Sequence, residues 1–117
     1  MKAFVIDDEA AIRWLLVRVL TEDGWEVETA ADGRQALSLF KPARFNLALV
    51  DVNMPGDLDG IAVASQMREQ DARLRILIMS ADPENVEKAK NAGFGPLVPK
   101  PFDRVTLGSM IGPPPAP

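Results

Sequence analysis

The sequence predicts an α/β domain built around a parallel sheet, and three features lead to this class. Short apolar segments recur along the chain, and each ends at a polar or turn residue, as Leu47 to Val50 do before Asp51. Segments with the apolar spacing of amphipathic helices separate them. The alternation runs through the chain, and parallel strands require such crossover connections. We therefore expect helices to cover both faces of one sheet.

The predicted strands are short and mostly apolar, which is typical of strands that are buried on both faces. They cover residues 3–6, 25–29, 47–50, 75–79 and 95–99. The second strand alternates apolar and polar residues from Trp25 onward, so one of its faces is expected to be more polar. The last strand contains Pro96 and Pro99, which cannot donate to a strand ladder. It is therefore predicted to lie at an edge of the sheet.

The predicted helices begin near capping residues or proline, and most end close to glycine or proline. They cover residues 12–22, 33–40, 61–70, 83–92 and 103–111. The first helix carries a single apolar stripe formed by Ile12, Leu15, Leu16, Val19 and Leu20. Trp14 lies on the opposite side of that helix, where a partner contact or packing against a neighbouring side chain would account for it.

Five strand-helix units with right-handed crossovers favour a flavodoxin-like (βα)5 three-layer sandwich with strand order 2-1-3-4-5. In this order the first and third strands flank the topological switch point, where open α/β sheets bind ligands. Asp7, Asp8 and Asp51 should therefore meet at the carboxyl ends of these strands. We expect one domain over residues 1–111, followed by a proline-rich tail or linker over residues 112–117.

The composition excludes several kinds of chemistry. The 117 residues carry a formal net charge of -4, which argues against nucleic-acid binding by this domain. No apolar segment has the length of a membrane span or a signal peptide, so we expect no membrane association and a cytoplasmic location. Because the chain has no cysteine or histidine, it can form no disulfide, no Ser-His-Asp triad and no histidine-ligated metal site. Its ionisable chemistry belongs to Asp, Glu, Lys and Arg.

Three carboxylates at neighbouring strand ends indicate a cation site. Asp7, Asp8 and Asp51 would repel one another, and each would resist ionisation unless a cation offset the repulsion. A ligand set made only of oxygen fits Mg²⁺, a hard cation that keeps several waters and often shares a phosphate. Calcium takes similar ligands, but no loop of this chain has the spaced acids of an EF-hand. Mg²⁺ is therefore the predicted cofactor.

Ser80 and Lys100 follow the fourth and fifth predicted strands, at the same edge of the sheet. A hydroxyl and an ammonium group can stabilise the charged oxygens of a phosphoryl group during transfer. Asp51 is then the predicted nucleophile, which would form an acyl phosphate. A single aspartate often caps a loop and a single lysine is often a solvated charge. The combination favours phosphoryl chemistry.

Over residues 1–111 the sequence resembles the receiver domains of two-component response regulators. The matching motifs, in chain order, are Asp7-Asp8, Asp51, Met54-Pro55, Asp59-Gly60, Ser80-Ala81 and Lys100-Pro101-Phe102. Each motif is weak alone, but their order and spacing together are highly specific. Ile12-Arg13-Trp14 also looks like the first helix of receivers attached to nitrogen-regulatory-type activators.

The resemblance implies a phosphodonor and a set of metal ligands. Asp51 would accept a phosphoryl group from a phosphohistidine on a sensor histidine kinase or a phosphotransfer protein. Asp8 and Asp51 would ligate Mg²⁺ directly, and Asp7 would do so through water. The backbone carbonyl of Asn53 would supply a further ligand.

The resemblance also implies a conformational switch. Ser80 would move toward the phosphoryl group and Lys100 would pair with it, and the peptide bond from Lys100 to Pro101 would be cis. The face formed by the fourth helix, the fifth strand and the fifth helix would then meet an output domain or form a homodimer.

Two departures from the family pattern bear on this switch. The family usually has an aromatic residue three positions before the lysine, where this chain has Leu97, and we expect Leu97 to pack in the edge strand. The loop from Met54 to Gly60 is one residue longer than the commonest family loop. Gly56 and Gly60 are expected to serve turn conformations because glycine tolerates positive φ.

The predicted function is a phospho-accepting receiver domain that catalyses its own phosphorylation and dephosphorylation with Mg²⁺. It is a signalling switch rather than a metabolic enzyme. The alternative is a receiver-fold interaction module that binds its partner irrespective of phosphorylation, and Leu97 and the longer loop give this alternative some weight. Against it, the five residues that would carry the phosphoryl chemistry are all present: Asp7, Asp8, Asp51, Ser80 and Lys100. A flavin-binding domain of the same fold is a poorer match, because acids after the first strand would repel the flavin phosphate.

Overall fold

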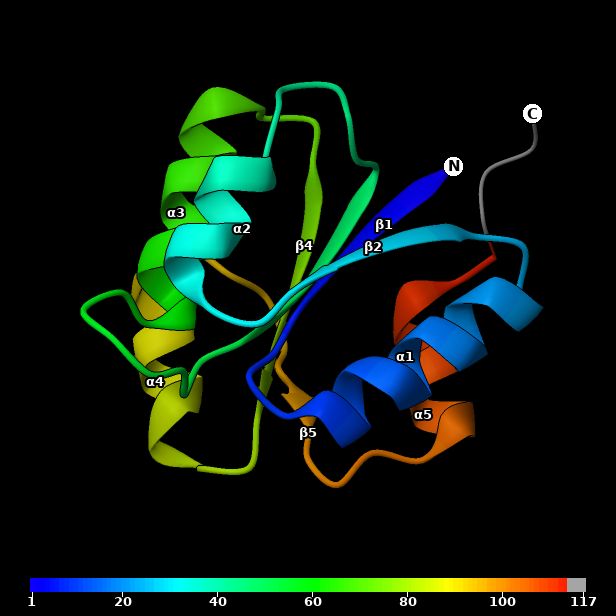
Figure 1. The fold of residues 1–117 in the computed structure, drawn as a ribbon. Helices are drawn as coiled ribbons and strands as arrows, with labels where there is room; N and C mark the ends of the chain where they lie inside the picture. The colour runs from blue at the N-terminus through cyan, green and yellow to red at the C-terminus, as the bar shows by residue number, and fades with distance from the viewer. Residues whose placement is uncertain (114–117) are drawn as a thin grey trace.

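Five parallel strands form one sheet in the order β2-β1-β3-β4-β5, which confirms the predicted order (Figure 1). The computed structural model describes residues 1–113. Its strands are β1 (Lys2–Ile6), β2 (Glu26–Ala30), β3 (Leu47–Asp51), β4 (Arg75–Ser80) and β5 (Val98–Pro99). The predicted tail begins at Gly112, and its residues 114–117 lie outside the described residues.

A helix follows each strand, as the alternating pattern predicted. The helices are α1 (Ala10–Glu22), α2 (Gly33–Leu39), α3 (Gly60–Gln70), α4 (Glu84–Asn91) and α5 (Arg104–Ile111). Figure 1 shows α2, α3 and α4 on one face of the sheet and α1 and α5 on the other, which is the predicted three-layer sandwich. Aspartate side chains cap three of the helices by accepting a backbone N–H of the first turn: Asp32 for α2, Asp59 for α3 and Asp103 for α5.

The hydrophobic core lies on both faces of the sheet. In β1, Phe4 and Ile6 belong to the cluster beneath α2, α3 and α4, whereas Ala3 and Val5 belong to the cluster beneath α1 and α5. All five residues of β3 are buried. Burial on both faces explains why these strands are continuously apolar rather than alternating.

The strand register brings the acidic ends of β1 and β3 together. Ile6 is paired with Val50, and Asp51 is paired with Met79 on the other side of β3. The residues that follow β1 and those that end β3 therefore meet at the carboxyl ends of these two neighbouring strands. This place is the switch point predicted from the strand order.

Two details of the predicted elements are wrong. Residues 95–97 are not part of the last strand, because β5 pairs with β4 only through Val98 and Pro99. Pro96 lacks the N–H that a longer ladder would need. In α1, Leu15 is exposed although Leu16, Val19 and Leu20 are buried, since Leu15 lies at the margin of the apolar stripe. Trp14 is exposed, as its position opposite the stripe indicated.

Among the described residues, no helix combines the length and the hydropathy needed to cross a bilayer.

Candidate functional site

Three carboxylates gather where β1 and β3 end. Asp7 and Asp8 follow β1, and Asp51 is the last residue of β3. One carboxylate oxygen of each residue lies within 4.8 Å of the others. Asp7 and Asp51 are buried and Asp8 is exposed, so the cluster opens to solvent through Asp8. The structure thus confirms the meeting of these three acids.

Both oxygens of Asp7 already have hydrogen-bond partners. Its Oδ1 accepts the backbone N–H of Glu9 at 2.9 Å, and its Oδ2 accepts the Nζ of Lys100 at 2.7 Å. Its backbone carbonyl accepts Nη1 of Arg13 from the first helix at 2.8 Å. The buried Asp7 is therefore tied both to the start of α1 and to Lys100, which follows β5.

Lys100 joins this cluster from the end of β5. Its Nζ lies 2.7 Å from Oδ2 of Asp7 and 3.3 Å from Oδ1 of Asp51, and its side chain is only 10% exposed. Burial opposes a charged ammonium group, but the hydrogen bond that it donates to Asp7 and the charge of Asp51 outweigh this effect and raise the pKa of Lys100. The ammonium group therefore stays charged between the two buried carboxylates. The Lys100-Pro101 peptide bond is cis, as the family resemblance implied.

Asp51 is less acidic than an ordinary aspartate. Burial, followed by the charge of Asp7, raises the pKa of Asp51 from 3.8 to about 6, although Lys100 acts in the opposite direction. The single ammonium group of Lys100 thus leaves the carboxylates incompletely neutralised. A divalent cation beside Asp8 and Asp51 would offset the remaining repulsion among the carboxylates. The donor set contains only oxygen atoms, which suits Mg²⁺. The residues present fit such an ion.

Ser80 ends β4 at the same edge of the sheet, but its hydroxyl group faces the next loop. Its Oγ accepts the backbone N–H of Asp82 at 3.0 Å and the side-chain amide of Asn85 at 2.7 Å. Its backbone carbonyl accepts the N–H of Lys100 at 3.0 Å, which ties β4 to the chain beyond β5. Within residues 1–113, the hydroxyl has hydrogen-bond partners in the loop and in α4 rather than in the carboxylate cluster.

Asn85 was not anticipated from the sequence. It lies in the first turn of α4, a helix whose residues are mostly polar, so an asparagine there has no distinguishing signal. Its burial becomes apparent only from the packing of α4 against the sheet.

The loop between β3 and α3 is anchored close to Asp51. Asn53 is exposed in this loop, two residues after Asp51, and it is not a member of the carboxylate cluster. The N–H of Gly60 donates to the carbonyl of Val52 at 2.9 Å. Gly56 has a φ of 98°, as expected for a turn glycine, but Gly60 does not have a positive φ. The prediction for Gly60 was wrong, because this glycine is required by close packing rather than by a turn.

The family model of the response regulator receiver domain matches residues 3–112. The chain belongs to this family. It is a receiver domain of two-component response regulators, which are phosphorylated at an aspartate.

Known relatives of this receiver domain include proteins of different lengths. Sporulation initiation phosphotransferase F of Bacillus subtilis is 35% identical over 104 residues, which are 87% of this chain and 83% of that protein. Response regulator MprA of Mycolicibacterium vanbaalenii is 38% identical over 104 residues, which are 87% of this chain and 45% of MprA. The solved structure of the Thermotoga maritima response regulator TrrA, in complex with Mg(2+)-BeF, is similar with a TM-score of 0.83 and 29% identity. The match covers 94% of this chain and 95% of the TrrA chain.

A pocket of about 410 Å³ adjoins the carboxylate cluster of this receiver domain. Ser80 and Lys100 contribute to its lining, together with Val86 of α4 and Leu97. Leu97 is half-buried against the core beneath α2, α3 and α4, but it lies just before β5 rather than inside the strand. Part of the prediction for Leu97 is therefore wrong, because the short β5 excludes it.

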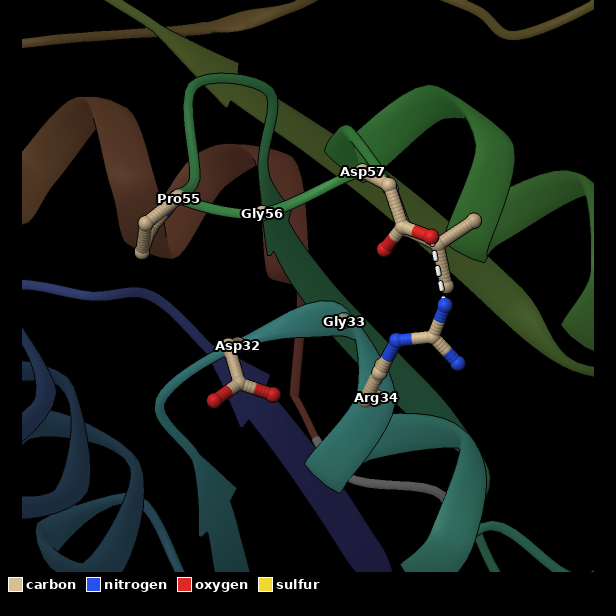
Figure 2. Close-up of a pocket in the computed structure, with 7 residues that line it drawn as sticks. Asp32, Gly33, Arg34, Pro55, Gly56 and Asp57 are labelled. Atoms are coloured by element: carbon tan, nitrogen blue, oxygen red, sulfur yellow. Dashed lines mark hydrogen bonds and ion pairs between the residues drawn. The ribbon is translucent and has the colours of Figure 1, made fainter.

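A second pocket, of about 270 Å³, lies where the start of α2 faces the loop between β3 and α3 (Figure 2). Arg34 forms an ion pair with Asp57 across this pocket. A Cβ atom on Gly33, the neighbour of Arg34, would lie 2.8 Å from Cγ2 of Val63, so α2 packs tightly against α3. None of the carboxylate cluster lines this pocket. Its residues anchor the loop of the receiver domain instead.

Proposed function

We propose that Asp51 is the phosphoacceptor of this receiver domain and that it takes a phosphoryl group from a phosphohistidine. The donor is a sensor histidine kinase or a phosphotransfer protein. One observation carries the assignment: Asp51 is a buried carboxylate that shares a cluster with Asp7 and Asp8, while Nζ of Lys100 lies 3.3 Å from its Oδ1. The cluster combines a nucleophile, a cation site and a fixed positive charge.

The transfer conserves atoms and charge in a simple displacement. An oxygen of the Asp51 carboxylate attacks phosphorus, the phosphorus-nitrogen bond of the phosphohistidine breaks, and the leaving imidazole nitrogen retains the electron pair of that bond and takes a proton from solvent. The product is an acyl phosphate. In dephosphorylation, a water oxygen attacks phosphorus, and the bond between phosphorus and the Asp51 oxygen breaks with its electron pair on that oxygen. The products are the Asp51 carboxylate and inorganic phosphate, which takes both protons of the water. The domain thereby catalyses its own phosphorylation and dephosphorylation without acting as a metabolic enzyme.

The oxygen donors of the cluster suit Mg²⁺, with Asp8 and Asp51 as direct ligands and Asn53 contributing its backbone carbonyl. Asp7 would act through water, and this role agrees with its two oxygens being engaged by Glu9 and Lys100. When bound, the ion supplies charge neutralisation for the phosphoryl oxygens. Lys100 is placed to add a second positive charge to the same oxygens, and the hydroxyl of Ser80 is the candidate hydrogen-bond donor to them.

Phosphorylation would change the interactions of the domain by shifting an existing two-state equilibrium. We propose that the face formed by α4, β5 and α5 meets an output domain or a second copy of the chain. Residues 1–111 would form the receiver and residues 112–117 a linker, with the protein acting in the cytoplasm.

Intact-mass measurement after incubation with acetyl phosphate tests the proposal. The wild-type chain should gain one phosphoryl group in the presence of Mg²⁺ and none in EDTA, and Asp51→Asn should gain none. A gain in Asp51→Asn would contradict the assignment of the acceptor. No gain in any sample would favour the alternative function, an interaction module that does not depend on phosphorylation.

A further inference from the structure

Asn85 is a buried polar side chain that the proposed chemistry does not use. It lies in the first turn of α4 and is 6% exposed, and Ser80 is buried to the same extent. Its Nδ2 donates to Oγ of Ser80 at 2.7 Å. A buried amide is costly unless it has such a partner, so this contact accounts for the polar residue at this position.

The hydrogen bonds of the Ser80 hydroxyl group are nearly saturated. A hydroxyl group has two acceptor sites and one proton to donate. Its acceptor sites receive the N–H of Asp82 at 3.0 Å and the amide of Asn85 at 2.7 Å. Its own proton is directed to the carbonyl of Asp82 at 3.4 Å, a long and weak bond. The strong contacts of Ser80 therefore point toward the loop and α4.

A phosphoryl group on Asp51 would require the proton of Ser80. The weak bond to the Asp82 carbonyl is easily given up, but a movement of Oγ toward Asp51 also breaks the bond from Asn85. The amide of Asn85 would then lie buried without its acceptor, or the start of α4 would have to move with the hydroxyl group. Asn85 would thus oppose such a movement of Ser80 and link it to α4.

We propose that Asn85 is a positioning residue that holds Ser80 in the unphosphorylated arrangement and sets how strongly phosphorylation at Asp51 draws the hydroxyl group inward. This inference rests on the proposed function of Asp51. It assigns to a residue of α4 the control of the phosphorylation equilibrium, and it predicts that removing the Asn85 amide favours the phosphorylated arrangement.

The test uses beryllofluoride with Mg²⁺ as a mimic of the phosphoryl group on the whole chain. Affinity is measured by calorimetric titration for the wild type, Asn85→Leu, Asn85→Ala, Ser80→Ala and the double variant Ser80→Ala/Asn85→Leu. Asn91→Ala, at the exposed far end of the same helix, is the control. Thermal unfolding of every sample establishes that it is folded.

We expect Asn85→Leu and Asn85→Ala to bind beryllofluoride roughly three- to tenfold more tightly than the wild type, the range set by one hydrogen bond. Asn91→Ala should bind as the wild type does. In the Ser80→Ala background, Asn85→Leu should bring no further change, because the residue acts through the hydroxyl group. An equal gain in that background would show a structural effect and overturn the inference, as would unchanged affinity in both single variants.

A measurement on the wild type keeps the inference testable if the variants do not fold. The side-chain amide resonances of Asn85 should change position in ¹⁵N–¹H spectra when Mg²⁺ and beryllofluoride are added, because the hydrogen bond to Ser80 is then broken or moves with α4. Those of Asn46, at the opposite end of the sheet, should not shift. If the Asn85 amide resonances do not change in the bound state, the inference about Asn85 is overturned, but the proposed function of Asp51 is not. A wild-type chain that binds no beryllofluoride would contradict the proposed function and the inference together.

Discussion

Gly60 packs directly against the backbone of Asp51. A Cβ atom added to Gly60 would lie 1.9 Å from the carbonyl oxygen of Asp51, which is far inside any tolerated contact. The contact places the first residue of α3 on the end of β3, so the loop between them must close tightly beside the carboxylate cluster. The geometry of the site therefore depends on a residue that carries no side chain.

Replacing Gly60 with alanine should destabilise the domain and slow phosphorylation. The added methyl group must displace the backbone at Asp51, and we expect a loss of about 3 kcal/mol in the free energy of unfolding. Urea denaturation measures this loss, and the rate of phosphorylation by acetyl phosphate reports on the site. The control is Gly108→Ala in α5, where nothing lies within 4 Å of an added Cβ atom. That variant should gain about 0.5 kcal/mol from helix propensity. Equal stability of Gly60→Ala and the wild type would contradict the packing argument.

Replacing Lys100 with methionine should separate two functions of its charge. Without the ammonium group beside Asp7 and Asp51, Mg²⁺ should bind about tenfold more tightly, because the competing positive charge is gone. Phosphorylation by acetyl phosphate should fall roughly a hundredfold, because the phosphoryl oxygens lose a charged partner. Calorimetry and intact-mass kinetics measure the two effects. Lys90→Met, which makes the same charge change on the exposed side of α4, should alter neither. Weaker Mg²⁺ binding in Lys100→Met would show that Lys100 organises the carboxylates rather than competing with the ion.

The raised pKa of Asp51 makes the domain less stable as this carboxylate ionises. The pKa of Asp51 is raised from 3.8 to about 6 by burial and by Asp7, so the folded chain binds its proton more tightly than the unfolded chain. This stabilising contribution is fully present below pH 4 and is lost as the pH rises through about 6. Asp51→Asn cannot ionise, so its free energy of unfolding does not fall in this way as the pH rises. In EDTA, the free energy of unfolding of Asp51→Asn should exceed that of the wild type by about 2 kcal/mol at pH 8, and the difference should shrink toward pH 4. Urea denaturation across this range is the measurement. A difference that does not vary with pH would rule out this origin.

Glu28 should show the opposite dependence on pH. Hydrogen bonds from Arg44, followed by Lys2, lower the pKa of Glu28 from 4.5 to about 2. Its contribution is present above the pKa of 4.5 of the unfolded chain and is lost as the pH falls toward 2. Glu28→Gln should therefore cost about 0.5 kcal/mol at pH 7, as expected for a partly exposed ion pair, and less at pH 3. Glu26→Gln on the same strand, which is exposed and has no ion pair within residues 1–113, is the control for urea denaturation. Similar losses for both variants at both pH values would contradict the prediction.

The architecture and the acidic cluster followed from local patterns in the chain. Apolar segments such as Leu47 to Val50 indicate strands that are buried on both faces, because every side chain of such a strand contacts the core and polar residues do not alternate with apolar ones. Once the strand order is inferred, the carboxyl ends of the strands bring Asp7 and Asp51 together without any knowledge of side-chain packing. Residues placed at strand ends are predictable for this reason.

Contacts that depend on how a helix sits on the sheet could not be read from the chain. The bond from Asn85 to Ser80 depends on the rotation of α4, and the contact of Gly60 with Asp51 depends on the tight closure of a loop. Likewise, only Val98 and Pro99 of the last strand pair with β4, and the point at which the chain comes close enough to β4 to pair is a tertiary property. A linear sequence specifies which surfaces prefer burial, since that preference belongs to each residue. Which atoms then touch is decided by packing among segments that are distant in the chain.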